Sequence, residues 1–321
     1  MSRPCRAALL SVVVLVLGGC SGSAYAPTAL PKPTPAATSP APAPSPSTSA
    51  PACGNPLASY APAATLPGPD ALPAGSTMAT IRDRGRLVVG VSADSLLLGA
   101  RNPLTGRIEG FDIDMARLVA QAILGDPDKI ELKVVTAAQR IPSLQAGTVD
   151  LIARNMTITC ARWQQIAFSA EYYRSGQKLL VPRGSPARSL DDLKGQRVCA
   201  PTGSTSLDQL RKHPDVVAVP ADTHTGCLVK FQQGQVDAIT GDDTVLAGLA
   251  AQDPYAQVVG KAFTAEPYGL GVNAKHVDLV QFVNGVLARA KADGRWTAAY
   301  DRWLAGALGP APAPPAPVYG R

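Results

Sequence analysis

The sequence contains no apolar run long enough to cross a membrane as a helix. The longest, residues 7–19, falls well short of the roughly 20 apolar residues that a spanning helix needs. Lys and Arg are scattered, so a formal net charge of +6 does not predict nucleic acid as a partner. C-x-x-C and H-x3–5-H spacings are also missing. Zinc, the competing explanation for the cysteines, is therefore not expected, and we predict no metal and no cofactor.

The start of the chain has the layout of an export signal. Arg3 and Arg6 precede the apolar stretch, and small residues lead into Cys20. This layout is similar to that of bacterial lipoprotein signals, in which the chain is cut before the cysteine and the cysteine receives lipid. We therefore expect a signal peptide at 1–19 and a lipid anchor on the extracytoplasmic side of the cell membrane. The alternative is an ordinary secretory signal with a chance cysteine.

Composition divides the remainder of the chain. Residues 20–76 are rich in Pro, Ala, Ser and Thr, which predicts an extended linker that buries little apolar surface. Residues 77–309 have the composition and length of one large or two modest domains. Residues 310–321 form a Pro-rich tail, in which we expect no helix or strand over 310–317.

Four cysteines remain once Cys5 and Cys20 are set aside. In an oxidising compartment an even number predicts two disulfides, with three possible pairings. We favour Cys199–Cys227, because both residues lie in the same half of the folded region. Cys53–Cys160 would then tie the end of the linker to the body.

Strand and helix patterns alternate along residues 77–309, which predicts two α/β units and, in the first, a parallel sheet. The expected strands are 85–91, 130–135, 149–153, 177–181, 196–200, 236–240 and 268–272. The expected helices are 111–124, 140–146, 227–233, 245–251, 279–292 and 296–304, with a helical turn at 190–193 and a helix opening at Leu207.

Polar residues follow several of these strands, at the edge where open α/β sheets bind ligands. The segment from Asn155 to Thr159, with Thr157 inside it, comes directly after one strand, and Arg162 follows with a guanidinium that can grip a carboxylate. The turn from Thr202 to Ser206, which includes Ser204 and Thr205, offers backbone N–H groups to an anion. The alternatives are a solvated surface arginine and a plain helix cap.

Further charged residues could bind the other charged groups of a zwitterionic ligand. Asp242, after the strand 236–240, can pair with an ammonium group, unless it only caps the next helix. Arg101 and Arg154 are candidates for a side-chain carboxylate, although each can equally be a surface residue. An anion clamp together with an acceptor for a cation is complementary to a free amino acid.

The same segments resemble a known family. The stretches LVVGV, GFDID, VDLIARNMTITCARWQQIAFSAEYY, LDDLKGQRVCAPTGSTS, GQVDAITGDD and YGLGVN resemble the polar amino-acid-binding lipoproteins of ABC importers, solute-binding protein family 3, and most of all the actinobacterial glutamine/glutamate-binding (GlnH-like) group. The resemblance implies a periplasmic-binding-protein-like α/β fold. Two lobes, 77–176 with 267–309 and 177–266, would be joined by a hinge of two strands near 172–176 and 266–269.

The resemblance also implies roles for individual residues. Arg162 would hold the ligand α-carboxylate, helped by Thr157 and the turn at 202–205. Asp242 would hold the α-amino group, and Asn155 would lend a backbone group. The chain departs from many relatives at Ser92, where they have an acidic residue, and at 96–98, where leucines replace aromatic residues. Cys160, which recurs in the actinobacterial group, supports the disulfide to Cys53.

Two other functions remain open at this point. An enzyme on the same fold would need a placed acid or base, but the three histidines fall outside every motif above, and no G-x-S-x-G or P-loop pattern occurs. A sensor would present the same bound amino acid to a membrane signalling protein instead of an ABC permease. We expect a monomer that binds glutamate or aspartate in preference to glutamine or asparagine, because Arg101 and Arg154 add positive charge near the cleft.

Overall fold

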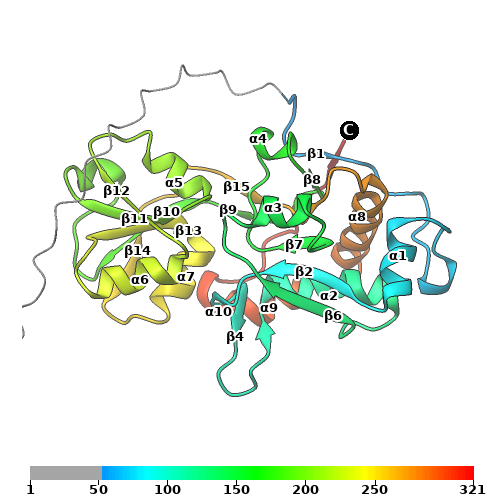
Figure 1. Ribbon diagram of the computed structural model, residues 1–321. Helices are drawn as coiled ribbons and strands as arrows, with labels where there is room; N and C mark the ends of the chain where they lie inside the picture. Colours follow the sequence, from blue (N-terminus) through cyan, green and yellow to red (C-terminus); the bar gives the residue numbers. More distant parts are fainter. Residues whose placement is uncertain (1–52) are drawn as a thin grey trace, which may run out of the picture. The chain divides into compact units, whose positions relative to one another are not determined.

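The computed structural model describes residues 53–321 (Figure 1). The expected signal peptide, Cys20 and the linker up to residue 52 lie outside the described residues. Within the described part, no helix is both long and apolar enough to span a bilayer.

The first lobe is built on a sheet in the order β6-β2-β7-β16-β8. Strand β2 (Leu87–Val91) is parallel to β6 (Ile130–Val134) and to β7 (Leu151–Ala153). Strand β16 (Gly271–Val272) lies antiparallel between β7 and β8 (Ala167–Phe168). The parallel arrangement predicted from the strands of the first half is therefore confirmed for β2, β6 and β7. Strand β16, which returns to this lobe from far along the sequence, adds an antiparallel strand that the prediction did not include.

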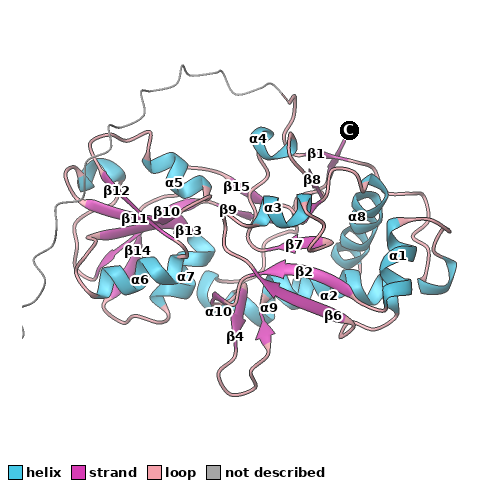
Figure 2. Cartoon of the chain, in the orientation of Figure 1, coloured by secondary structure: helices cyan, strands magenta, loops and turns pink. Residues whose placement is uncertain are grey.

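Helices cover both faces of this sheet (Figure 2). Helix α2 (Phe111–Leu124) has the bounds that the sequence predicts, between Gly110 and the left-handed Gly125 that ends it. It shares one apolar core with α1 (Thr77–Arg84), α8 (Val277–Ala292) and α9 (Arg295–Trp303). A second, smaller core on the other face includes Leu144 of α3 (Arg140–Gln145). The short helices α4 (Cys160–Trp163) and α10 (Ala305–Leu308) complete the lobe.

The second lobe has the sheet order β12-β11-β13-β10-β14. Its strands are β10 (Gln177–Pro182), β11 (Arg197–Pro201), β12 (Val217–Ala221), β13 (Ala238–Asp242) and β14 (Ala256–Val259), with a 3-10 turn at Leu190–Leu193. Strand β10 is antiparallel to both of its neighbours, whereas β11, β12 and β13 are parallel.

Apolar side chains on the second sheet alternate between two cores, as expected for strands that are covered on both sides. Val198 and Ala200 pack with α5 (Thr205–Leu210), whereas Cys199 packs on the opposite face with α6 (His224–Gln232) and α7 (Asp243–Ala250). The Cys199–Cys227 disulfide, which the sequence favours, joins β11 to α6 inside the second core.

Two antiparallel strands connect the lobes. Strand β9 (Tyr173–Ser175) pairs with β15 (Glu266–Tyr268), at the two hinge positions that the family resemblance implies. Each sheet contains one antiparallel strand, and that strand is the one entered from the hinge: β10 after β9, and β16 after β15. The carboxyl ends of the parallel strands in both sheets consequently border the cleft between the lobes.

The two ends of the described chain pack on the first lobe. Strand β1 (Ala58–Ser59) pairs with β17 (Val318–Tyr319), and Ser59 is fully buried. The Arg321 guanidinium lies 3.9 Å from the centroid of the Trp163 ring. The disulfide Cys53–Cys160 is present as well. The expectation that all of 20–76 is a loose linker is thus wrong for 53–76, because tertiary pairing with the tail and a disulfide fix a composition that is weakly structured by itself.

A hairpin and a polar network complete the first lobe. Strands β3 (Asp94–Ser95), β4 (Gly99–Arg101) and β5 (Ile108–Glu109) form a small separate sheet around the expected turn at 102–106.

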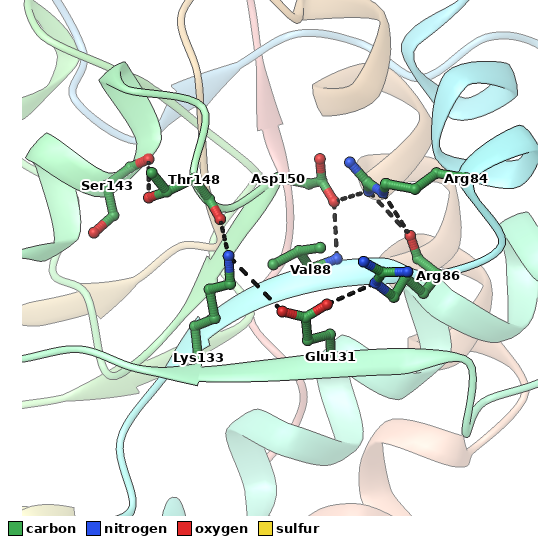
Figure 3. A network of polar contacts seen from close by, with 8 residues as sticks. All are labelled: Arg84, Arg86, Val88, Glu131, Lys133, Ser143, Thr148 and Asp150. Carbon is green, nitrogen blue, oxygen red and sulfur yellow. Dashed lines mark hydrogen bonds and ion pairs between the residues drawn. The ribbon is translucent and has the colours of Figure 1, made fainter.

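Near the amino ends of β2 and β7, the Asp150 carboxylate accepts hydrogen bonds from the Val88 N–H and from Arg84 (Figure 3). This network joins neighbouring strands away from the cleft, so its role is structural.

Candidate functional site

Polar side chains from both lobes meet in one pocket in the cleft. It is lined by Ala137, Arg140, Arg154, Asn155, Thr157 and Arg162 of the first lobe and by Pro201, Ser204, Thr205, Ser206, His224 and Asp242 of the second. Several of these residues directly follow β7 or β11 or end β13, so the pocket lies at the strand ends where the sequence predicts it.

Asn155 sits at a strained turn directly after β7. Its φ is 33°, a left-handed conformation that asparagine tolerates better than most residues. The Asn155 N–H donates to the Asp112 carboxylate at 2.7 Å, and the Asn155 carbonyl accepts from Arg140 Nη1 at 3.2 Å. Burial raises the Asp112 pKa to about 6, although hydrogen bonds from Tyr172 and Asn155 oppose the rise. The turn is therefore held from both sides by buried charged groups.

Arg140 holds the backbone around the pocket by hydrogen bonds. Its guanidinium donates to the carbonyls of Ala137, Arg154 and Asn155 in the first lobe, and to the Gly203 carbonyl of the second lobe at 3.0 Å. Burial, followed by the charges of neighbouring arginines, lowers its pKa. Arg140 thus orders the strand-end loop and joins the two lobes.

Arg162 is held by the four-residue helix α4. Thr159 caps this helix by accepting from the Arg162 N–H, and the Cys53–Cys160 disulfide fixes its first residue. Arg162 is 8% exposed, and its guanidinium donates to the Thr157 carbonyl at 2.7 Å and to the Gly203 carbonyl at 3.2 Å. Both acceptors are neutral carbonyls, so the cation has no direct anionic partner among these bonds.

Glu266, the first residue of the hinge strand β15, connects the lobes below the pocket. Its Oε2 accepts hydrogen bonds from Thr157 of the first lobe at 2.7 Å and from Thr205 of the second at 2.8 Å. Its Oε1 accepts from Thr264 at 2.6 Å. These bonds couple the position of the hinge to two residues that line the pocket.

Asp242 ends β13 and is 4% exposed. Its Oδ2 accepts a hydrogen bond from the Tyr268 hydroxyl at 2.6 Å. Burial, together with the charge of Glu266, raises the pKa of Asp242 to about 7. The raised pKa means that the ionised form of this buried carboxyl group is unfavourable. A bound ammonium group would stabilise that ionised form.

Three buried polar atoms of the pocket have no hydrogen-bond partner in the described part of the chain. They are Arg154 Nε, Asn155 Oδ1 and His224 Nε2. Buried polar atoms are nearly always paired in proteins, so a group of three in one pocket indicates a surface shaped for a polar ligand.

The structure separates the expected site residues into two groups. Those that line the pocket are Arg162, Thr157, Asn155, Asp242, Ser204, Thr205 and Arg154. Two residues do not. Arg101 is exposed and donates to the Gly106 carbonyl within its own hairpin, and Thr202 is exposed. Ser204 also caps α5, so the simple capping explanation holds for that side chain.

Sequence reasoning missed Arg140, His224 and Glu266 as residues of the site. Arg140 opens a helix that was expected at 140–146, after a strand that was expected at 130–135, so its position at the sheet edge was an available signal. His224 opens α6 after β12, but no strand was expected at 217–221 and the helix was expected only from residue 227, so no local signal marked this residue. Glu266 reaches the site only through the pairing of β15 with β9, which local patterns do not reveal.

The pocket is nearly closed, with about 10 Å³ of free space, roughly enough for one water molecule. A wider groove of about 780 Å³ lies on the second lobe, around Phe231 and Tyr255, but no arginine lines it. Among residues 53–321, no cluster of His, Cys, Asp or Glu is arranged to hold a metal ion.

Known proteins with similar sequences share one function class. A model of the bacterial extracellular solute-binding proteins, family 3, matches residues 87–306. The chain is 41% identical over 230 residues to the ABC transporter glutamine-binding protein GlnH of Bacillus subtilis, which covers 71% of this chain and 84% of that protein. It is 32% identical over 240 residues to the glutamate-binding protein GluB of Corynebacterium efficiens, covering 71% and 80%.

Solved structures of binding proteins are similar as well. A solute receptor for L-cysteine from Neisseria gonorrhoeae matches with a TM-score of 0.69 and 31% identity, over 73% of this chain and 96% of that one. An ancestral arginine-binding protein bound to glutamine matches with a TM-score of 0.65 and 33% identity, over 69% and 98%. The similar proteins are binders of solutes and not enzymes, which agrees with the non-enzymatic function expected from the sequence.

Proposed function

Because the chain belongs to the bacterial extracellular solute-binding proteins, family 3, we propose that it captures a free polar amino acid in the cleft and delivers it to an ABC importer. The observation that carries this proposal is the pocket itself. It combines three buried arginines, a buried aspartate and unpartnered polar atoms, contributed by both of the hinged lobes. That set is complementary to a zwitterion with a polar side chain.

The backbone of the ligand would be held at its two charged groups. Arg162 would exchange its hydrogen bonds to the Thr157 and Gly203 carbonyls for a paired contact with the α-carboxylate. The α-ammonium group would contact Asp242, whose unfavourable buried charge it would balance. Thr157 and Thr205 would add hydrogen bonds from opposite lobes.

Entry of the ligand requires the cleft to open. A free volume of about 10 Å³ cannot hold an amino acid, so the lobes would first separate about β9 and β15. Opening would break the bonds of Arg140 and Arg162 to Gly203 across the cleft. The ligand would then replace some of these bonds as the lobes close on it.

For the side chain of the ligand, we propose glutamate or aspartate in preference to glutamine or asparagine. Arg101, one basis for this preference, lies outside the pocket, but Arg154 lines it and is 95% buried. The Nε atom of Arg154 has no hydrogen-bond partner within residues 53–321, so this guanidinium can donate to an anion in the pocket. Titration calorimetry with the four amino acids tests the order of affinity. Tight glutamine binding without glutamate binding would reverse it.

We further propose that lipid on Cys20 anchors the protein at the extracytoplasmic face of the membrane. The support is the sequence of the first twenty residues, since the described structure begins at Cys53. Labelling of growing cells with an alkyne fatty acid should mark the wild type but not Cys20→Ala. Equal labelling of both would exclude this anchor.

Import is tested in cells. Deletion of the gene should lower uptake of radiolabelled glutamate at micromolar concentration, and the wild-type gene but not Arg162→Ala should restore it. Unchanged uptake, together with a lost transcriptional or kinase response to glutamate, would instead assign the protein to sensing.

A further inference from the structure

His224 brings a titratable group into the pocket that the proposed contacts to the amino-acid backbone do not use. It is the first residue of α6, and its Nε2 atom is buried without a partner in the described part of the chain. The Thr240 carbonyl accepts a hydrogen bond from the imidazole. Since Nε2 has no partner, the donor is Nδ1. In the neutral ring, Nε2 therefore carries a lone pair and is a hydrogen-bond acceptor.

The backbone of β13 makes room for this ring. A Cβ atom on Gly241 would lie 2.5 Å from His224 Nε2, so the imidazole packs directly on a glycine that precedes Asp242. His224 is thereby held beside the residue proposed to bind the ligand ammonium group. Arg154 and Asn155 of the other lobe line the same pocket.

The surroundings keep the ring neutral. Burial, together with the positive charges of Arg154 and Arg140, lowers the pKa of His224 to about 4, although the Thr240 carbonyl and Asp94 oppose the shift. The amino end of α6 acts in the same direction as the arginines. At neutral pH, Nε2 therefore keeps its lone pair.

Together the three unpartnered groups form a small subsite. Arg154 is a cationic donor, whereas Asn155 Oδ1 and His224 Nε2 are acceptors. A side-chain amide matches this set without change, because its oxygen accepts from Arg154 and its N–H group donates to an acceptor. A side-chain carboxylate matches Arg154 but faces the lone pairs of the other two groups.

We propose that His224 and Arg154 bind the end of the ligand side chain, and that an acidic side chain binds there together with one proton on His224 Nε2. This inference rests on the proposed function. The proton comes from the buffer acid, and the new Nε2–H donates to the ligand carboxylate. An amide side chain binds without this proton, because its own N–H donates to the Nε2 lone pair.

The consequence is a pH dependence that differs between two similar ligands. The proton on Nε2 is absent in the free protein above about pH 4 and present in the glutamate complex, in which the carboxylate raises the pKa of His224. Glutamate affinity relative to glutamine affinity therefore rises as pH falls, by up to about tenfold per pH unit below the pKa in the complex. The titration of Asp242 also makes binding depend on pH, but it affects both ligands equally because they carry the same ammonium group. Its contribution therefore cancels in the ratio of the two affinities.

Calorimetry in phosphate and in Tris gives the number of protons taken up, since the two buffers differ in ionisation enthalpy. We would titrate glutamate and glutamine into wild type, His224→Gln and the control His213→Gln between pH 5.5 and 8. His213 lies outside the pocket, beside Gln209. Wild type and His213→Gln should take up close to one proton more with glutamate than with glutamine at the lower pH values. His224→Gln should show no difference.

Equal proton uptake with both ligands in the wild type would overturn the inference, as would a difference that survives in His224→Gln. Glutamate that fails to bind throughout this range while glutamine binds refutes it as well. If neither ligand binds at any pH, the proposed function itself is wrong, which separates the two failures.

Discussion

Replacing Asp242 with asparagine should stabilise the ligand-free protein while it removes ligand binding. Asp242 is buried and its pKa is raised from 3.8 to about 7, so its charge opposes folding. The direction of the pH dependence follows from linkage. The burial of the Asp242 charge does not lower the free energy of unfolding below the pKa that Asp242 has in the unfolded chain, because the group is then protonated in both states. The loss of stability grows as pH rises and reaches its full size above about pH 7. Between pH 5 and pH 7, two units correspond to at most about 2.7 kcal/mol, and relaxation of the site reduces this to about 1–2 kcal/mol.

Urea unfolding of the ligand-free wild type and Asp242→Asn at pH 5 and pH 8 measures this effect. The free energy of unfolding of the variant, relative to that of the wild type, should be about 1–2 kcal/mol higher at pH 8 than at pH 5. The asparagine still accepts the hydrogen bond from Tyr268, so the packing of the site is kept. Asp301→Asn, at an exposed position on α9, is the control and should gain nothing. A difference in free energy of unfolding between variant and wild type that stays constant or shrinks with rising pH would refute the electrostatic reasoning.

Other substitutions test the clamp, the closure and the disulfide. Arg162→Ala should cost about 2–5 kcal/mol of ligand affinity by calorimetry, with Arg162→Lys in between, because the lysine keeps the charge but not the paired donors. Gly203→Ala should weaken binding, since its Cβ would lie 2.7 Å from the backbone of the opposite lobe, whereas Gly234→Ala, equally strained with φ +66° but open, should not. Replacing Cys53 and Cys160 with serine should lower the free energy of unfolding by about 3–5 kcal/mol, because the bridge closes a separation of 107 residues. An unchanged urea midpoint would contradict that estimate.

The sequence predicts most of the local structure because local signals specify it. Helix α2 is bounded by glycines and has an apolar face, and its predicted limits agree with the observed ones. The strand expected at 268–272 instead divides into β15 and β16, because the chain leaves the hinge at Gly269 and joins another sheet. That division depends on which strands pair, and pairing over long distances leaves no local pattern.

The site was predictable where residues follow strands in sequence, as Arg162 and Asp242 do. It was not predictable where tertiary packing decides the role of a residue. Arg101 is close in sequence to the expected edge, yet its guanidinium bonds within its own hairpin. His224 belongs to no motif and reaches the pocket because Gly241 leaves room for its ring.

The most direct test of the account is a crystal structure of the protein with glutamate. We expect glutamate between the lobes, with its α-carboxylate on Arg162 and its α-ammonium group on Asp242. Glutamate bound in the groove around Phe231 and Tyr255, or bound in the cleft with its ammonium group away from Asp242, would contradict it.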